Sequence, residues 1–190
     1  MKKITLALLA VASLVPTAAS AHEAGDYIFR AGTATVRPNA GSDDVFCNGS
    51  FKVDNNTQLG LTFSYLITDN IGVELLAATP FNHKVGLAGV GTIADVKQLP
   101  PTLMAQYYCR DKQDKLRPYL GIGLNYTKFF DEKFNATGSD IGLTNLSVKD
   151  SWGVAGQAGM DYMVSENWML NMSVWWMNIE SDVKFNLAGE

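Results

Sequence analysis

Side chains suited to acid–base or nucleophilic chemistry are scarce in this chain of 190 residues. A Ser–His–carboxylate hydrolase needs a histidine held beside its nucleophile, and the chain offers two, His22 and His83. His22 follows a leader-like segment and His83 lies beside Lys84 in a long link, so both are more simply explained as solvated or packing side chains. Two histidines so far apart are also a poor metal site. We therefore expect no enzyme activity, no metal and no cofactor, and lipid hydrolysis that depends on His83 would contradict this.

Tryptophan is the other residue type whose placement raises a chemical question. Residues 167–178 read NWMLNMSVWWMN and hold three of the chain's four tryptophans. In a β-strand, adjacent side chains point to opposite faces. One face would then be wholly apolar: Trp168, Leu170, Met172, Val174 and Trp176. The other would be mixed: Met169, Asn171, Ser173, Trp175 and Met177. The neighbouring tryptophans would therefore lie in different environments.

Six further segments alternate in the same way, at residues 25–36, 58–67, 71–78, 102–109, 118–127 and 151–162. Alternation of period two predicts β-strands. A soluble β-sandwich would alternate too, with its apolar face inward. The choice between a soluble sandwich and a membrane-spanning barrel depends on what the two faces carry.

The apolar face carries aromatic residues near the segment ends, as the interfacial girdles of membrane barrels do. These are Tyr65, Tyr107, Tyr126, Trp152, Tyr162, Trp168 and Trp176. The opposite face is rich in small, neutral polar residues, which suit a narrow lumen better than a solvated surface. Its polar and charged members are Arg30, Glu74, Gln106, Asn125, Gln157, Asp161 and Asn171. Its glycines are expected to leave open space in the lumen: Gly60, Gly121, Gly123, Gly153 and Gly159.

The links between these segments alternate in length. Short links lie at residues 68–70, 109–116 and 165–167, and long ones at 37–57, 80–101 and 130–150. This pattern is typical of outer-membrane barrels, whose short turns face the periplasm. Backbone groups in lipid must be paired, so the sheet must close. The sequence thus predicts an all-β fold, a transmembrane antiparallel up-and-down β-barrel. The apolar residues of the second and third long links could pack on one another or form a mouth that collects hydrophobic molecules.

The first residues have the layout of a secretory signal peptide. Lys2 and Lys3 precede an apolar run and a small-residue site that ends at Ala21. We expect cleavage after residue 21 and a barrel domain over residues 22–190, rather than an anchoring helix, because the apolar run is short. Without the two leader lysines, 13 basic residues stand against 19 acidic ones. A net charge of −6 argues against a nucleic-acid partner.

The two cysteines could form a disulfide in an oxidising compartment. Cys47 lies in the first long link, whereas Cys109 begins the second short one. The predicted topology therefore puts them at opposite ends of a barrel roughly 25 Å tall, while a disulfide needs Cα atoms within about 7 Å. We expect two free thiols.

Several stretches of this chain closely resemble the OmpW family of small outer-membrane barrels. They are HEAG from His22, NNTQLGLTF from Asn55, DNIGVELLAATPF from Asp69, LPPTLMAQ from Leu99, RPY from Arg117, NYTKFF from Asn125, KDSWG from Lys149 and NMSVWWM from Asn171. The resemblance implies a monomer in the outer membrane of a Gram-negative cell, in contact with the lipid bilayer, lipopolysaccharide and the barrel assembly machinery. It also implies a narrow channel for small hydrophobic molecules, with sideways exit into the bilayer as an option.

One feature departs from the family pattern. The family has eight strands and a terminal aromatic residue, whereas the alternating segments here number seven and the sequence given stops at Glu190. We therefore expect seven strands, with a gap or a strained closure between the first and the seventh.

Heights along the strands suggest where a channel would narrow. Trp175 lies eight residues beyond the turn residue Asn167, and Leu76 lies six beyond Asn70. At about 3.3 Å per residue and a tilt of about 40°, the two occupy neighbouring levels of the lumen. We expect Leu76 and Trp175, approached by Met104 and Met177, to form an apolar constriction. Packing of a narrow barrel without transport, in a structural or phage- or bacteriocin-docking protein, is the alternative.

Overall fold

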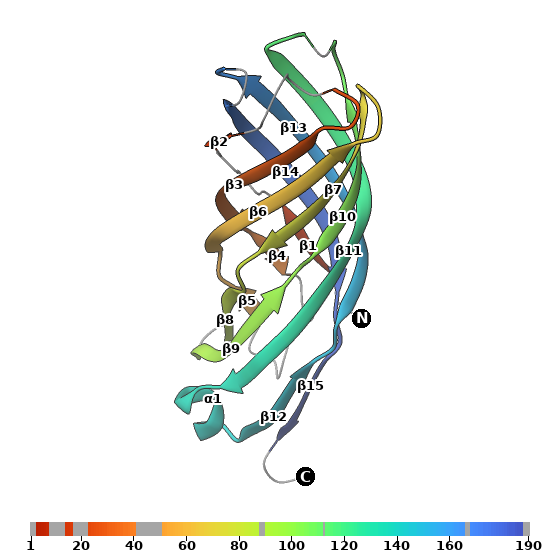
Figure 1. Cartoon of the computed structure of the whole chain (residues 1–190). Coiled ribbons are helices and arrows are strands. Elements are labelled where there is room, and N and C mark those ends of the chain that lie inside the picture. The colour runs from red at the N-terminus through yellow and green to blue at the C-terminus, as the bar shows by residue number, and fades with distance from the viewer. Residues whose placement is uncertain are drawn as a thin grey trace.

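Seven long antiparallel strands form the wall of the molecule. The computed structural model describes residues 3–7, 14–16, 23–40, 51–87, 90–111, 113–165 and 168–187. The wall strands are, in sheet order, β3 (Tyr27–Val36), β6 (Asn56–Leu66), β7 (Ile71–Ala78), β10 (Thr102–Tyr108), β11 (Leu116–Phe134), β13 (Ser151–Met163) and β14 (Trp168–Glu180). Figure 1 shows them tilted and wrapped around a common axis. Each of the seven alternating segments coincides, to within one or two residues at its ends, with part of one of these strands. This confirms the predicted all-β barrel class.

The period of two decides which side chains face inward. Along β11, Leu120, Ile122 and Leu124 are exposed, whereas the alternate residues Tyr119 and Asn125 are buried. The outward residues are large and apolar; Ile122, for example, is 76% exposed. A surface of contiguous apolar side chains is untenable in water but suits lipid. The exposed face is therefore the lipid-facing one, and the polar face lies inside, as expected for a membrane barrel rather than a soluble sandwich.

The free edge of β14 is occupied by segments from the start of the chain. β1 (Lys3–Ala7) and β2 (Leu14–Pro16) both pair antiparallel with β14, and β4 (Pro38–Ala40) pairs with β1. In the sheet path of the described residues, β3 and β14 are not neighbours, so the expected gap lies between them. An edge strand presents unpaired N–H and C=O groups, and the extended backbones of β1 and β2 pair with those of β14. Cleavage of residues 1–21 stays a prediction.

The long links are more ordered than a loop pattern suggests. They contain β5 (Phe51–Val53), β8 (Phe81–Leu87), β9 (Gly91–Leu99), α1 (Ala136–Asp140) and β12 (Leu143–Val148), and β15 (Val183–Leu187) pairs with β12. In Figure 1 the short turns lie at the upper end of the barrel and α1, β12 and β15 at the lower end. We call these the turn end and the loop end. None of the helices in the described ranges is long and apolar enough to cross a bilayer.

Apolar residues of the long links pack against each other at the loop end. Ile93, Ala94 and Leu143 are buried in one cluster, and Val85, Val90, Phe134, Leu146 and Phe185 pack on it. Of the two alternatives left open by the sequence, mutual packing therefore accounts for these residues. Ile141 is different, since 43% of it is exposed.

Candidate functional site: the barrel interior

Inward-facing side chains fill the barrel in three successive layers. Nearest the turn end is an apolar layer composed of Ile28, Leu66, Tyr108, Tyr119, Met163 and Met169. A polar layer follows, centred on Arg30. The layer nearest the loop end is apolar again: Ala34, Val36, Leu76, Phe81, Met104, Ala155, Trp175, Met177 and Ile179. The interior is therefore not polar-walled throughout, as the sequence had suggested, because aromatic and methionine side chains occupy both ends.

Arg30 is the centre of the polar layer. Its Nη1 lies 2.6 Å from Glu74 Oε2 and its Nη2 lies 2.6 Å from Asp161 Oδ2. Nη1 also donates to Ser64 Oγ at 2.8 Å, and Nη2 to the Tyr108 hydroxyl at 2.9 Å. Arg30 is 1% exposed, and Glu74 and Asp161 are fully buried. The three charges thus neutralise one another in part and satisfy each other's hydrogen bonds inside the barrel.

Neutral polar side chains extend this network to the remaining walls. Gln157 donates to Glu74 Oε1 at 2.8 Å and accepts from Gln106 at 2.9 Å. Asn171 donates to Asp161 Oδ1 at 2.7 Å. The hydrogen-bonded set therefore joins β3, β6, β7, β10, β13 and β14, which means that it crosses the lumen from wall to wall. Opening it would expose a buried charge without its partner, which costs about 3–5 kcal/mol. We call this set the polar floor. It is made of Arg30, Ser64, Glu74, Gln106, Gln157, Asp161 and Asn171, and the hydroxyl of Tyr108 reaches into it from the turn-end layer.

Four of the five lumen glycines do not leave the open space that we expected: Gly121, Gly123, Gly153 and Gly159. At Gly121, Gln157 Oε1 lies 2.9 Å from the point that a Cβ would occupy. At Gly159 the ring of Tyr119 fills the corresponding position. At Gly123 and Gly153 a backbone carbonyl of the facing strand comes close instead. The expectation was wrong because glycine in a barrel admits a large neighbour or a close strand as readily as it leaves a void.

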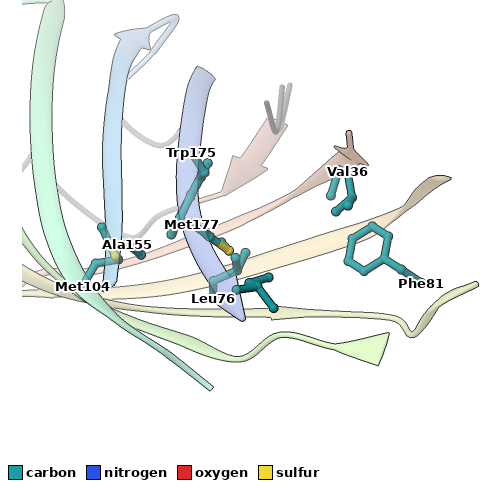
Figure 2. Packing of buried hydrophobic residues seen from close by; sticks show 9 residues of the cluster. Val36, Leu76, Phe81, Met104, Ala155, Trp175 and Met177 are labelled. Carbon is teal, nitrogen blue, oxygen red and sulfur yellow. The ribbon is translucent and has the colours of Figure 1, made fainter. Parts of the chain in front are cut away.

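The four residues predicted to narrow the channel lie together in the apolar layer at the loop end. Leu76, Met104, Trp175 and Met177 are 2%, 1%, 2% and 5% exposed, and all belong to one cluster. Figure 2 shows them converging from β7, β10 and β14, with Phe81 and Val36 alongside. Trp175 Nε1 donates to Ser173 Oγ at 3.0 Å, so its polar edge is satisfied within its own strand. We call this layer the apolar ring.

Asn125 is separated from the other predicted lumen residues. It is buried, but its Nδ2 donates to Thr102 Oγ1 at 2.8 Å and its Oδ1 accepts from Thr127 at 2.7 Å. These partners lie towards the loop end of β10 and β11. Of the seven polar residues predicted for the lumen, six therefore meet in the polar floor and Asn125 does not.

The predicted interface aromatics all lie on the outward face. Tyr65, Tyr107, Tyr162 and Trp168 are exposed near the turn end, and Trp152 and Trp176 towards the loop end. Tyr126 is partly covered, since its ring lies 4.8 Å from that of Trp152. The structure therefore gives two outward aromatic levels, which match the two interfaces of a bilayer.

Sequence reasoning missed several interior residues. Tyr108 and Tyr119 point inward like Gln106, but as tyrosines they were not counted among the polar lumen residues. Arg117 is buried, with its Nη2 donating to the Asp69 carbonyl oxygen at 2.6 Å. The alternation of inward and outward side chains along β10 and β11 would have identified all three as inward-facing. Phe81 was assigned to a link, where alternation gave no guidance.

The thiol prediction is tested in part. Cys109 is a free cysteine beside the second short turn. Cys47 lies outside the described residues, as does His22.

Comparison with known proteins identifies the family. The model described as "OmpW family" matches residues 23–190. Outer membrane protein W of Escherichia coli (strain K12) is 57% identical over 190 residues, which is 100% of this chain and 90% of that protein. A more distant relative, the "Dibenzothiophene metabolism operon protein PahQ" of Pseudomonas aeruginosa, is 25% identical over 170 residues, covering 84% of this chain and 76% of its own length.

A solved structure shows the same architecture. The crystal structure of the outer membrane protein OprG from Pseudomonas aeruginosa superimposes with a TM-score of 0.81 at 46% identity, covering 87% of this chain and 84% of that one. With its seven tilted strands, lipid-facing exterior and these relatives, the chain belongs to the OmpW family of β-barrels and lies in the cell outer membrane.

Proposed function

We propose that this barrel conducts small hydrophobic molecules from the cell exterior through the apolar ring. The observation that carries the proposal is the order of the layers: an apolar ring towards the loop end and a hydrogen-bonded polar floor towards the turn end. A slim apolar molecule loses little free energy among Leu76, Trp175 and Met177. Water and ions lose hydrogen bonds there without replacement, so the ring opposes their passage.

The polar floor favours sideways release. A molecule that passes the ring next meets the buried ion pairs of Arg30 with Glu74 and Asp161. Moving straight on would separate those charges in a low-dielectric interior and offer an apolar molecule nothing in return. Release between strands into the hydrocarbon region avoids this cost, and it delivers an apolar molecule to the phase in which it is most soluble.

The compound mentioned in the name of one relative agrees with an apolar cargo. PahQ is named for an operon of dibenzothiophene metabolism, and dibenzothiophene is a flat apolar molecule. The size and apolar character of that class of compound suit a ring built from tryptophan, leucine and methionine.

A structural or docking barrel without transport is the second candidate. The interlocked charges of the polar floor and the packed cluster at the loop end favour it, because both make the interior rigid. The two functions differ in what the ring does. In a docking barrel its side chains are only packing, and shortening them changes stability without changing permeability.

Catalysis is not part of the proposal. Both ring nitrogens of His83 are engaged, Nδ1 with the Asp54 carbonyl oxygen at 2.8 Å and Nε2 with the Gln98 side chain at 2.9 Å. Neither partner is a nucleophile, so this histidine has the contacts of a packing residue rather than those of a general base.

The test is ion conductance in planar bilayers with the double variant Leu76→Ala, Trp175→Ala. Removing both side chains opens the dry segment, and we expect conductance to rise. The matched control is Leu75→Ala with Trp176→Ala, which removes the same residue types one position away, where they face lipid. The control should conduct like the parent. Equal conductance in all three proteins would support the docking barrel.

A further inference from the structure

Four lysines share one outward face at the loop end of the barrel. This face belongs to the sheet formed by β8, β9 and the loop-end half of β11, which are hydrogen-bonded in that order and are visible side by side in Figure 1. Phe81, His83 and Gln98 point inward and are buried. The alternate residues point outward, and the lysines among them are Lys84, Lys97, Lys128 and Lys133. We call this surface the lysine face.

Strand register brings these lysines close together. Asp95 of β9 lies between Lys84 of β8 and Lys133 of β11. The register of β11 shifts between Phe130 and Lys133, and Asp131 lies in this shift with a φ of 58°. From there Asp131 accepts from Lys97 Nζ at 2.7 Å and faces Lys133 Nζ at 3.4 Å. The irregularity thus holds two ammonium groups around one exposed carboxylate.

The lysine face continues directly from the lipid-facing wall. β9 extends the line of β10 past Pro100 and Pro101, since Leu99 pairs with Lys128 and Thr102 with Asn125. On β11 the outward series runs through apolar residues to Tyr126, and Lys128 comes next. Two residues rise about 6–7 Å along a strand. The first lysine therefore lies one step beyond the interfacial aromatic level, where lipid headgroups begin.

Lysines outnumber carboxylates on the lysine face. Four lysines stand against Asp95 and Asp131 on the lysine face, in a chain whose formal net charge is −4. Asp150 borders the same face beside Lys128, because its Oδ1 accepts from the Phe129 backbone N–H at 3.1 Å. Among the described residues near the ends of β12 and β14, Lys149 and Lys184 stand against Glu180 and Asp182. There Lys149 is paired with Asp182 at 3.2 Å. The lysine face therefore carries an excess of lysines over carboxylates in a chain of negative net charge.

We propose that the lysine face binds the phosphate groups of the phosphorylated glycolipid that forms the outer leaflet. Ammonium groups bind phosphate as point charges through charge-assisted hydrogen bonds. The exposed pairs with Asp131 contribute little by themselves and yield readily to a doubly charged partner. The acyl chains of the same lipid would lie along Leu120, Ile122 and Leu124, on the wall beneath the lysines. This inference does not depend on the proposed transport, because it concerns the outer surface and not the lumen.

The test measures retention of diphosphoryl lipid A by the full-length protein in nanodiscs, by native mass spectrometry. The parent is compared with the fourfold variant Lys84→Gln, Lys97→Gln, Lys128→Gln, Lys133→Gln. A lysine near an anionic lipid surface is worth about fivefold in affinity, so we expect the fourfold variant to lose retention by at least tenfold. Lys→Arg changes at the same positions should retain the lipid, because the charge is kept. The matched control is Lys149→Gln with Lys184→Gln, and it should retain lipid A like the parent.

Two further arms identify the group that is bound. Lipid A without its phosphates should be retained no better by the parent than by the fourfold variant. Inorganic phosphate at millimolar concentration should not displace diphosphoryl lipid A, and displacement would indicate a site for free phosphate instead. Parent-like retention by the fourfold variant, or an equal loss in the control, would overturn the proposal. If the fourfold variant does not fold, Lys84→Gln with Lys128→Gln replaces it, and a loss below threefold would have the same meaning.

Discussion

Trp175 and Trp176 are consecutive in β14 but lie on opposite sides of the barrel wall. Trp175 is 2% exposed and packs with Leu76, Met104 and Met177, whereas Trp176 is 45% exposed on the lipid-facing side. Brominated lipids quench only fluorophores that they can touch. In variants that keep one tryptophan each, we expect quenching of Trp176 and little quenching of Trp175. Equal quenching of the two would mean that the strand is rotated or that the ring is open to lipid.

Loss of the central cation should destabilise the barrel severely. Arg30→Met leaves Glu74 and Asp161 buried without their partner, a change that costs about 3–5 kcal/mol. We expect a large fall in the denaturant midpoint of unfolding. Adding Glu74→Gln and Asp161→Asn to the same chain should restore much of the loss, because no buried charge then remains. Arg37→Met is the control, since Arg37 is exposed just beyond β3.

Glycine 159 should not tolerate a side chain, because the Tyr119 ring occupies that space. Gly159→Ala forces this ring out of the turn-end layer, and overpacking of this kind costs typically about 1–3 kcal/mol. Gly156→Ala in the same strand is the control, as its added Cβ would meet only Trp176 Cε3, at 3.9 Å. Unfolding in denaturant should separate the two variants. Similar stability of both would mean that the ring is not held where the structure has it.

Acidification should loosen the hairpin of β8 and β9. Burial lowers the pKa of His83 from its ordinary value of 6.5, and the neighbouring Asp54 carbonyl only partly opposes this. The unfolded hairpin therefore takes up a proton at a higher pH than the folded one. Stability is full above about pH 6.5 and falls as pH drops from there towards the lowered pKa. The groups that face His83 are Asp54, just before β6, and Gln98 on β9.

Hydrogen exchange of the hairpin at pH 7 and pH 5 measures this effect. We expect faster exchange in residues 81–99 at pH 5 in the parent and no such change in His83→Gln, which keeps a polar side chain without titrating. A parent hairpin equally protected at both pH values would contradict the assignment.

The wall of this barrel was predictable from sequence because side chains alternate between the two faces of a strand, so one placed residue fixes the faces of its neighbours. Once Trp176 is outward, Trp175, Ser173 and Asn171 must be inward, and the same logic placed Arg30 and Glu74. The filling of the lumen was less predictable. Alternation shows which face a side chain points to, but not which side chains it contacts across the lumen. Nothing in the sequence says that the Tyr119 ring fills the space at Gly159.

The loop end escaped prediction for a different reason. Phe81 and His83 alternate with Asn82 and Lys84 over too few residues to distinguish a strand from a loop. Their order comes from pairing with β9 and β11, which are distant in sequence. The pairing of residues 3–7 with β14 was likewise invisible, since it depends on which strand edge is free.

Uptake of a labelled apolar compound tests the central claim most directly. Cells without the gene are compared with cells that carry the parent, the double variant Leu76→Ala, Trp175→Ala, or its lipid-facing control Leu75→Ala, Trp176→Ala. We expect the parent and the control to raise uptake of the apolar compound over that of a polar compound of equal size. The double variant should lose this preference, because its widened ring admits both. Equal uptake with and without the parent gene would contradict the account.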